Sequence, residues 1–266
     1  SMYEQVTPDV AFQIGSAASK RALEIDPLEP SAYINLAADK IYYEYDFPAA
    51  RALLLEARKL APRLPTVHML FGTAAAYCGE LEEALGHLDA AQEVDPLFPA
   101  IRANRGVAYY FAGKFDDANR VFLDLLTEYP QRTATRISLA SSLTMCGAYE
   151  AARNELNAVI EHDPEEASAR LALAILTARD GDKRQAKKIA NAVRSSSDIE
   201  RTNPSALAGV YAQLGETQES MKWLTLAAES HEGGFAEVQV DPLLAPLVGV
   251  DAFHALLARY GLTAKQ

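Results

Sequence analysis

Residues 99–132 read PAIRANRGVAYYFAGKFDDANRVFLDLLTEYPQR, and the landmarks of this stretch recur along the chain at a fixed step of 34 residues. Its Gly113 returns at the same step as Gly79, Gly147, Gly181 and Gly215. A fixed period in this range is the sequence signature of a repeat architecture. The 34-residue stretch is therefore the unit from which the rest of the chain is read.

Two further positions repeat in phase with the glycine. The alanine of the unit occurs as Ala50, Ala84, Ala118, Ala152 and Ala186. The closing proline occurs as Pro62, Pro96, Pro130 and Pro164. Three registers in phase over most of the chain indicate a repeat protein built from one small unit.

The unit is predicted to be a pair of helices. Apolar residues from Ile101 onward recur at helical spacing up to Gly113, whose missing Cβ permits the left-handed conformation that ends a helix. A second helix opens at Phe115 and stops before Pro130, which has no amide hydrogen to continue it. Neither helix can bury its apolar stripe alone, so the pairs must stack on one another, and we expect an all-α solenoid.

The residues Gly106 and Tyr109, Ala118 and Phe122, and the closing Pro130 match the pattern Gly-x2-Tyr, Ala-x3-Phe, Pro. The chain thereby resembles the tetratricopeptide repeat family over about nine tenths of its length. The resemblance implies a right-handed superhelix of antiparallel helix pairs with terminal capping helices. We expect a partial repeat acting as an amino-terminal cap over residues 1–30 and a carboxy-terminal strap and capping helix over 235–266. Between them we expect six units: 31–64, 65–98, 99–132, 133–166, 167–200 and 201–234.

Two places depart from the pattern. Tyr45 takes the glycine position of the first full unit, next to Tyr42 and Tyr43, and these tyrosines either pack as an end cap or form an aromatic contact surface. In a later unit the polar stretch 195–198 replaces the closing proline, which predicts a longer or looser connection there.

The last 25 or so residues form a separate short element. Residues 240–247 are predicted to be a turn-rich strap, followed by a helix from Asp251 to Tyr260 with Gly261 as its stop. Phe253, Leu256 and Leu257 share one helical face, which we expect to cover the core of the last repeat.

The ending VDPLLAPL…FHALLARYGL resembles the carboxy-terminal region of bacterial multidomain regulators. These include CadC-like winged-helix transcription regulators, some class III adenylate cyclases and some Ser/Thr kinases with trailing repeats. The resemblance implies that the chain is the regulatory or sensory part of a longer signalling or transcription-regulating protein. The abrupt start at Val6, partway through a unit, agrees with this expectation.

Composition argues against two classes of protein, those that bind nucleic acid and those that span a membrane. The net charge of −11 argues against a nucleic-acid surface, because neutralising phosphates requires clustered Lys and Arg. No apolar run approaches the ~20 residues of a membrane span. Cys78 and Cys146 hold the same slot two repeats apart, too distant for a disulfide, so we expect free thiols and a cytoplasmic location.

No pattern in the chain indicates catalysis. The five histidines lack metal-ligand spacing, and neither cysteine has a histidine at a matching slot. Gly233 and Gly234 lack the Lys of a phosphate loop, and paired carboxylates open second helices, where they suit the helix dipole. We therefore predict a non-enzymatic interaction module without a cofactor or a metal.

In the family that the chain resembles, the first helix of each unit lines a concave groove. Carried onto this sequence, the groove positions predict a peptide-binding site made of Met69, Thr73, Tyr77, Asn104, Val107, Tyr110, Phe111, Ile137, Ser141, Met145 and Arg179. The expected partner is a protein that offers an extended apolar peptide or a helix. In a second interpretation, Tyr77, Phe111 and Met145 pack between neighbouring helices or against the chain's own ends.

Arg102, Arg136 and Arg170 form a ladder one period apart. Their stems could cover the core while their heads pair with acidic neighbours such as Glu128. The ladder could instead bind an anion or small molecule, which is the alternative function. The open first unit also makes homodimer formation an expectation.

Overall fold

The structure is a computed structural model that describes residues 8–195 and 203–265. Within these residues the regular structure is helical, with no strand, and the expected all-α solenoid is confirmed. The helix pairs are α2 (Pro30–Tyr42) with α3 (Phe47–Leu60), α4 (Pro65–Tyr77) with α5 (Leu81–Val94), α6 (Pro99–Phe111) with α7 (Phe115–Glu128), α8 (Thr133–Met145) with α9 (Tyr149–His162), α10 (Ala167–Arg179) with α11 (Lys183–Ser195), and α12 (Pro204–Leu214) with α13 (Thr217–Glu229). A single helix α1 (Pro8–Ile25) precedes the pairs, and η2 (Gly233–Glu237), η3 (Pro242–Leu247) and α14 (Asp251–Arg259) follow them.

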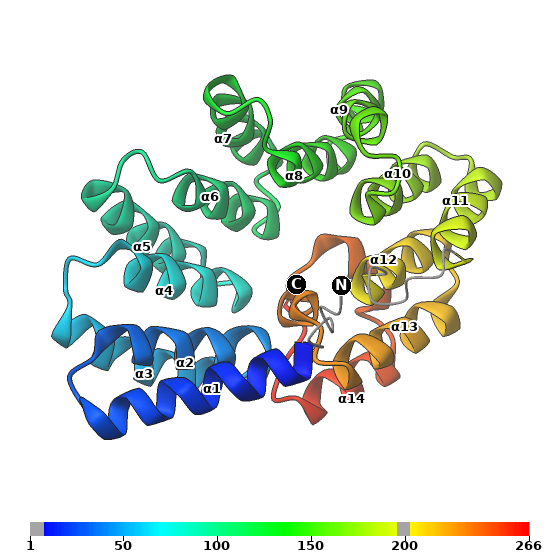
Figure 1. Ribbon diagram of the computed structural model, residues 1–266. Coiled ribbons are helices and arrows are strands. Elements are labelled where there is room, and N and C mark those ends of the chain that lie inside the picture. Colours follow the sequence, from blue (N-terminus) through cyan, green and yellow to red (C-terminus); the bar gives the residue numbers. More distant parts are fainter. Residues whose placement is uncertain (1–7, 196–202, 266) are drawn as a thin grey trace, which may run out of the picture.

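The pairs follow one another around an arc. The first helices α4, α6, α8, α10 and α12 line its inner side, while α5, α7, α9 and α11 form the outer side (Figure 1). The segment after α13 runs into the middle of this arc (Figure 1). The connection predicted at 195–198 falls mostly on residues 196–202, which lie outside the described residues.

The turn inside each pair needs a left-handed backbone. Gly79 (φ +74°), Gly113 (φ +70°) and their equivalents supply it, and Tyr45 adopts the same conformation with φ +58°. The strain at this tyrosine is offset by its packing, since its side chain is only 2% exposed and its ring lies 5.1 Å from that of Phe235. The tyrosines of this turn therefore pack as an end cap, the first of the two interpretations.

The two helices of a pair approach closely where one of them has a small residue. An added Cβ on Gly106 of α6 would lie 2.3 Å from the ring of Phe122 on α7. Only glycine leaves room for this ring, which is 1% exposed in the middle of the pair.

The first and last repeats meet. The largest hydrophobic cluster contains Ile41 and Phe47 from the first pair together with Leu224 from the last pair and Phe235. His231 stacks on Tyr43 with ring centroids 4.2 Å apart, and its Nδ1 lies 2.8 Å from the Tyr43 carbonyl oxygen. The array is thus closed end to end by packed side chains.

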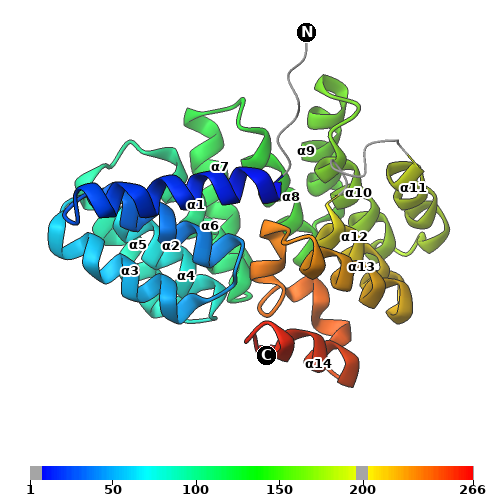
Figure 2. The ribbon, with the colours of Figure 1, turned by 60° about the horizontal axis from the view of Figure 1, so that its bottom comes forward.

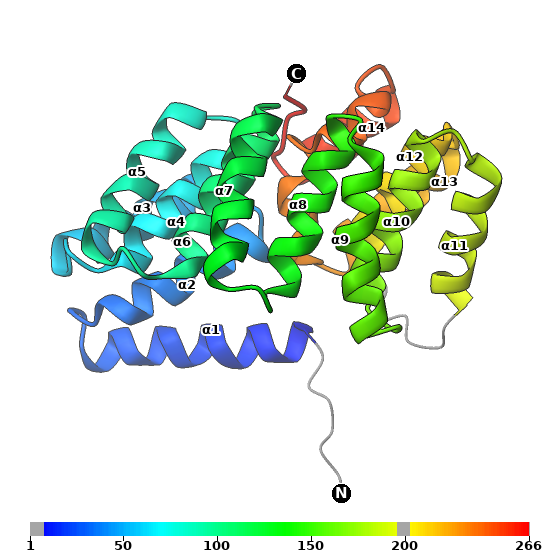
Figure 3. The same ribbon diagram turned by 90° about the horizontal axis from the view of Figure 1, so that it is seen from above.

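The cap covers the last repeat. Helix α14 contacts α13 at the end of the chain (Figures 2 and 3), and its Phe253 and Leu257 are fully buried. Cys78 and Cys146 are both free thiols, as predicted. Across the part of the chain that the structure describes, none of the helices has the length and apolar character needed to cross a bilayer.

Candidate functional site

The concave face holds part of the chain's own carboxy-terminal region. Residues 233–247, which we call the inner segment, pass along this face through η2 and η3 (Figure 1). Only the helix from Asp251 was expected to cover the last repeat, and no contact was predicted for the strap, which reaches helices on the opposite side of the arc through Tyr110. The inner segment is part of the core, since Phe235, Leu244 and Leu247 are at most 2% exposed.

Three predicted groove residues are linked to the inner segment by hydrogen bonds, two of them directly and the third through another side chain. The Tyr77 hydroxyl donates a hydrogen bond to the carboxylate of Glu237, and Tyr110 donates to Asp241 Oδ1 at 3.4 Å. Arg179 donates to Gln213 Oε1 at 2.9 Å. The Gln213 amide in turn donates to the Leu243 carbonyl at 2.6 Å, so the polar end of the expected groove fastens the inner segment.

Other predicted groove residues bond or pack among the helices. Asn104 Nδ2 donates to Thr73 Oγ1 at 3.1 Å, and Thr73 donates to the Met69 carbonyl at 3.0 Å. Met145 is partly buried against the clusters on either side of α8. These four residues lie apart from the cavity described next.

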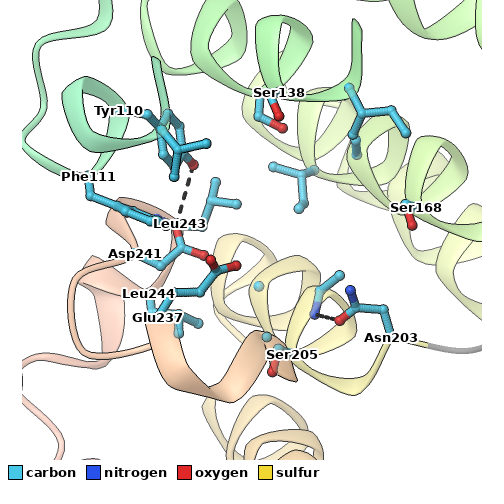
Figure 4. Close-up of a pocket in the computed structure, with 18 of the residues that line it drawn as sticks. Tyr110, Phe111, Ser138, Ser168, Asn203, Ser205, Glu237, Asp241, Leu243 and Leu244 are labelled. Atoms are coloured by element: carbon cyan, nitrogen blue, oxygen red, sulfur yellow. Dashed lines mark hydrogen bonds between the residues drawn. The ribbon is translucent and has the colours of Figure 1, made fainter. Parts of the chain in front are cut away.

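A cavity of about 260 Å³ remains between the inner segment and helices α6, α8, α10 and α12. It gathers five of the predicted groove residues: Val107, Tyr110, Phe111, Ile137 and Ser141. Its other walls are Phe122, Ser138, Ser168, Ala172, Ile175, Asn203, Ser205, Ala206, Gly209, Gly234, Glu237, Val238, Asp241, Leu243 and Leu244. Figure 4 shows Glu237 and Asp241 on the inner-segment side of the cavity and Ser138 and Ser168 across it.

A second cavity, of about 440 Å³, lies on the other side of the inner segment. Phe111 and Asp241 line both cavities, so the inner segment divides the concave face at these side chains. The first cavity contains more of the predicted groove positions and is the candidate functional site.

The inner segment brings two carboxylates to this site. Asp241 caps η3 by accepting a hydrogen bond from the Leu243 amide at 2.9 Å. The described hydrogen bonds from Leu243 and Tyr110 both end on Oδ1, which leaves Oδ2 of Asp241 available to a ligand. Glu237 ends η2 one helical turn before Asp241.

The pKa values of both acids are raised in this environment. Burial, helped by the nearby charges of Asp241 and Glu232 and opposed by the hydrogen bond from Tyr77, raises the pKa of Glu237 to about 8. Burial raises the pKa of Asp241 to about 6, opposed by hydrogen bonds from Leu243 and Tyr110. Burial also raises the pKa of Glu232, whose carboxylate accepts hydrogen bonds from the Ser205 amide and hydroxyl.

The lining of the cavity has no basic side chain, and its described residues include no arginine, lysine, histidine or cysteine. Sequence reasoning missed Glu237 and Asp241. The available signal was two acids four residues apart in the largely apolar stretch 235–248, with no basic residue among them.

The arginine ladder lies outside the cavity, and each member has an acidic partner. Arg102 pairs with Glu128 at 2.7 Å, Arg170 with Glu165 at 3.6 Å, and Arg136 with Glu155. Arg136 also donates to the Pro130 carbonyl at 3.0 Å. These contacts match the structural interpretation of the ladder.

Comparison with known proteins gives one family and a set of shared folds. The model of the tetratricopeptide repeat family matches residues 109–176. No curated protein sequence matches the chain significantly.

Three solved structures illustrate the likeness in fold. Human IFIT1, described as a dimer with m7Gppp-AAAA, superposes with a TM-score of 0.62 at 15% identity, over 93% of this chain and 59% of that one. PilF of Pseudomonas aeruginosa gives 0.54 at 15% identity, over 75% and 90%. A tetratricopeptide repeat protein from Parabacteroides merdae gives 0.51 at 19% identity, over 87% and 92%.

At these identities the structural likeness concerns the fold alone. Proteins of this type generally act as scaffolds for protein–protein interaction. The chain thus has the fold of a tetratricopeptide repeat solenoid, and the model of that family matches its residues 109–176.

Proposed function

We propose that the chain is a non-enzymatic interaction module that binds a short segment of a partner protein at the cavity beside the inner segment. The observation that supports this most is that Val107, Ile137 and Ser141, from two successive repeats, are partly exposed and line one cavity. The larger part of the concave face is taken up by the chain's own residues. The guest is therefore a segment that inserts a side chain, rather than a helix laid along the whole groove.

The size of the cavity supports a small insertion. Ligand pockets commonly measure ~300–1,000 Å³, and the cavity here is about 260 Å³. Its walls combine apolar groups such as Ile175 with the hydroxyls of Ser138, Ser141 and Ser168. An apolar stem with a polar end fits this mixture of walls.

The proposal also places this chain in a larger cytoplasmic bacterial protein, as the regulatory or sensory part that binds the partner. Anion sensing by the arginine ladder is less favoured, because an anion would have to displace Glu128, Glu155 or Glu165 from its arginine. The proposal includes self-association through α1. This helix exposes large apolar side chains that a second copy could cover, since Ile14 is 62% and Ile25 73% exposed. Light scattering at several concentrations would show a dimer mass if this part is right.

The cavity can be closed without changing the net charge. We would select peptides from a displayed random library on the wild type and measure their affinities for Ser141→Trp and for Asn157→Trp. Ser141 lines the cavity, whereas Asn157 is exposed on α9 and serves as the matched control. The proposal expects at least a tenfold loss of affinity in Ser141→Trp and no change in Asn157→Trp. Peptides that bind all three proteins equally would place the interaction elsewhere.

A further inference from the structure

The walls of the cavity carry an unbalanced charge. Glu237 and Asp241 enter it from the inner segment, and Glu232 acts on Glu237 from the preceding turn. The lining supplies no arginine, lysine or histidine in the part of the chain that the structure describes. Both carboxylates are half-buried, and their hydrogen bonds come from tyrosine hydroxyls and a backbone amide, so no cation of the lining balances their charge.

The available hydrogen bonds satisfy the two acids only in part. Tyr77 donates to Glu237, while Tyr110 and the Leu243 amide both donate to Asp241 Oδ1. Asp241 Oδ2 is left for a donor that comes from the cavity. Ser138 and Ser168 lie across the cavity and can accept or donate as a ligand requires (Figure 4).

The remaining walls are apolar. Val107, Phe111, Ile137 and Ile175 surround the space in front of the carboxylates. A ligand that matches both parts has a saturated stem and a terminal cation with several N–H donors. An ammonium group supplies three such donors on a compact charge.

We propose that the cavity binds an alkylammonium group, with Asp241 and Glu237 holding the charged end and the apolar residues of α6, α8 and α10 holding the stem. This inference rests on the proposed function, in which the ammonium belongs to a lysine side chain of the partner segment. A free alkylamine offers the same chemistry, and the experiment separates the two sources.

Binding is expected to depend on pH. Four groups face the two acids: Tyr42 from α2, Tyr77 from α4, Tyr110 from α6 and Glu232 before η2. The charge of Arg179 on α10 acts on Tyr110. None of the groups that act directly on the acids supplies a positive charge. Because burial raises the pKa of Asp241 to about 6 and of Glu237 to about 8, both ionise between pH 5.5 and 8.5, and ammonium affinity rises over this range.

The first arm of the test uses n-butylammonium, which reproduces the lysine side chain, with n-butanol and butyrate as the neutral and anionic probes. Amide chemical shifts are followed by NMR on the intact chain, for the wild type, Asp241→Asn and Glu161→Gln. Glu161 is exposed on α9 and is the control for loss of one acid. We expect n-butylammonium to shift amides of α6, α8 and the inner segment, with about tenfold weaker binding in Asp241→Asn and no change in Glu161→Gln.

The second arm uses the peptides selected on the wild type, each compared with a version in which lysine is replaced by norleucine. Loss of binding on this replacement, together with weaker binding to Asp241→Asn, identifies lysine as the source. Binding of n-butylammonium without any selected peptide would keep the ammonium site and remove the peptide proposal. Peptides that bind equally with norleucine, or equal shifts from n-butanol and n-butylammonium, would overturn the inference while leaving peptide binding intact. Circular dichroism of each variant shows that it is folded before binding is compared.

Discussion

The two ends of the solenoid differ from its middle in the hydrophobic packing that stabilises them. At the ends, the first pair, the last pair and the inner segment share one large hydrophobic cluster. In the middle, α6 to α9 bury smaller and separate clusters, such as the one formed around Phe122 and Leu139. The difference teaches that the non-repeating residues after α13 bind distant parts of the array together, whereas the central repeats rely on their neighbours.

The same contrast separates stability from function. The closed ends leave the concave face filled around Phe235 and Tyr45. The middle keeps a cavity with partly exposed walls and two carboxyl groups whose pKa values burial raises. Titratable groups whose pKa is shifted in this way commonly accompany a binding site.

The largest effect is expected from Phe235→Ala. The ring is fully buried and packs 5.1 Å from Tyr45 and 5.3 Å from Tyr260, so its removal leaves a cavity in the shared cluster. We expect a loss of about 3–5 kcal/mol of folding free energy, or roughly 10 °C in Tm. Thermal unfolding followed by circular dichroism measures it. A change of less than about 2 °C would mean that the inner segment does not support the fold.

A smaller effect, confined to the middle, is expected from Gly106→Ala. The new Cβ would lie 2.3 to 2.8 Å from three atoms of the Phe122 ring, so the ring or helix α7 has to move. We expect destabilisation of about 1–3 kcal/mol in chemical denaturation.

Gly86→Ala is the control for that change. Gly86 is also helical, and an added Cβ there meets nothing within 4 Å, so the substitution should be neutral or stabilising by up to about 1 kcal/mol. Equal effects at Gly106 and Gly86 would contradict the close packing of α6 on α7.

A third and still smaller effect, expected from Glu237→Gln, is a gain of stability. Burial raises the pKa of Glu237 from 4.5 to about 8, so the folded state holds this proton more tightly than the unfolded state. The stability that this group contributes is present in full below about pH 4.5 and is lost as the pH rises through 8. We therefore expect Glu237→Gln to raise Tm by about 2–6 °C at pH 8.5 and by much less at pH 5.

A pH series of thermal melts tests this point, with the exposed Glu161→Gln as the control. A lower Tm for Glu237→Gln at pH 8.5 would show that the carboxylate is needed by the fold. A gain of stability combined with weaker binding of n-butylammonium would instead support a site that is maintained for function.

The solenoid itself could be predicted from the sequence, because each turn needs a left-handed residue at a fixed place. Gly79, Gly113 and Gly215 repeat at that place, and all have positive φ. The contrast between ends and middle could not be predicted in this way. The inner segment does not repeat, and contacts such as Tyr77 with Glu237 join residues far apart in sequence.

The candidate site was predicted in part for the same reason. Val107, Ile137 and Ser141 follow from the position of the first helices, and they do line the cavity. Tyr77, Asn104 and Arg179 sit at equivalent slots but bond to Glu237, Thr73 and Gln213. The periodic pattern specifies which slots face inward, whereas what fills the space in front of them depends on tertiary contacts.

The most direct measurement of the central claim is hydrogen exchange with mass spectrometry on Phe235→Ala beside Phe122→Ala. Both rings are at most 1% exposed, so the two variants remove comparable packing from an end and from the middle. If the inner segment joins the two ends, Phe235→Ala speeds exchange in α2 and in α13 together, while Phe122→Ala acts on α6, α7 and α8 alone. Faster exchange in Phe235→Ala that stays within α12 to α14 and leaves α2 unchanged would contradict the account.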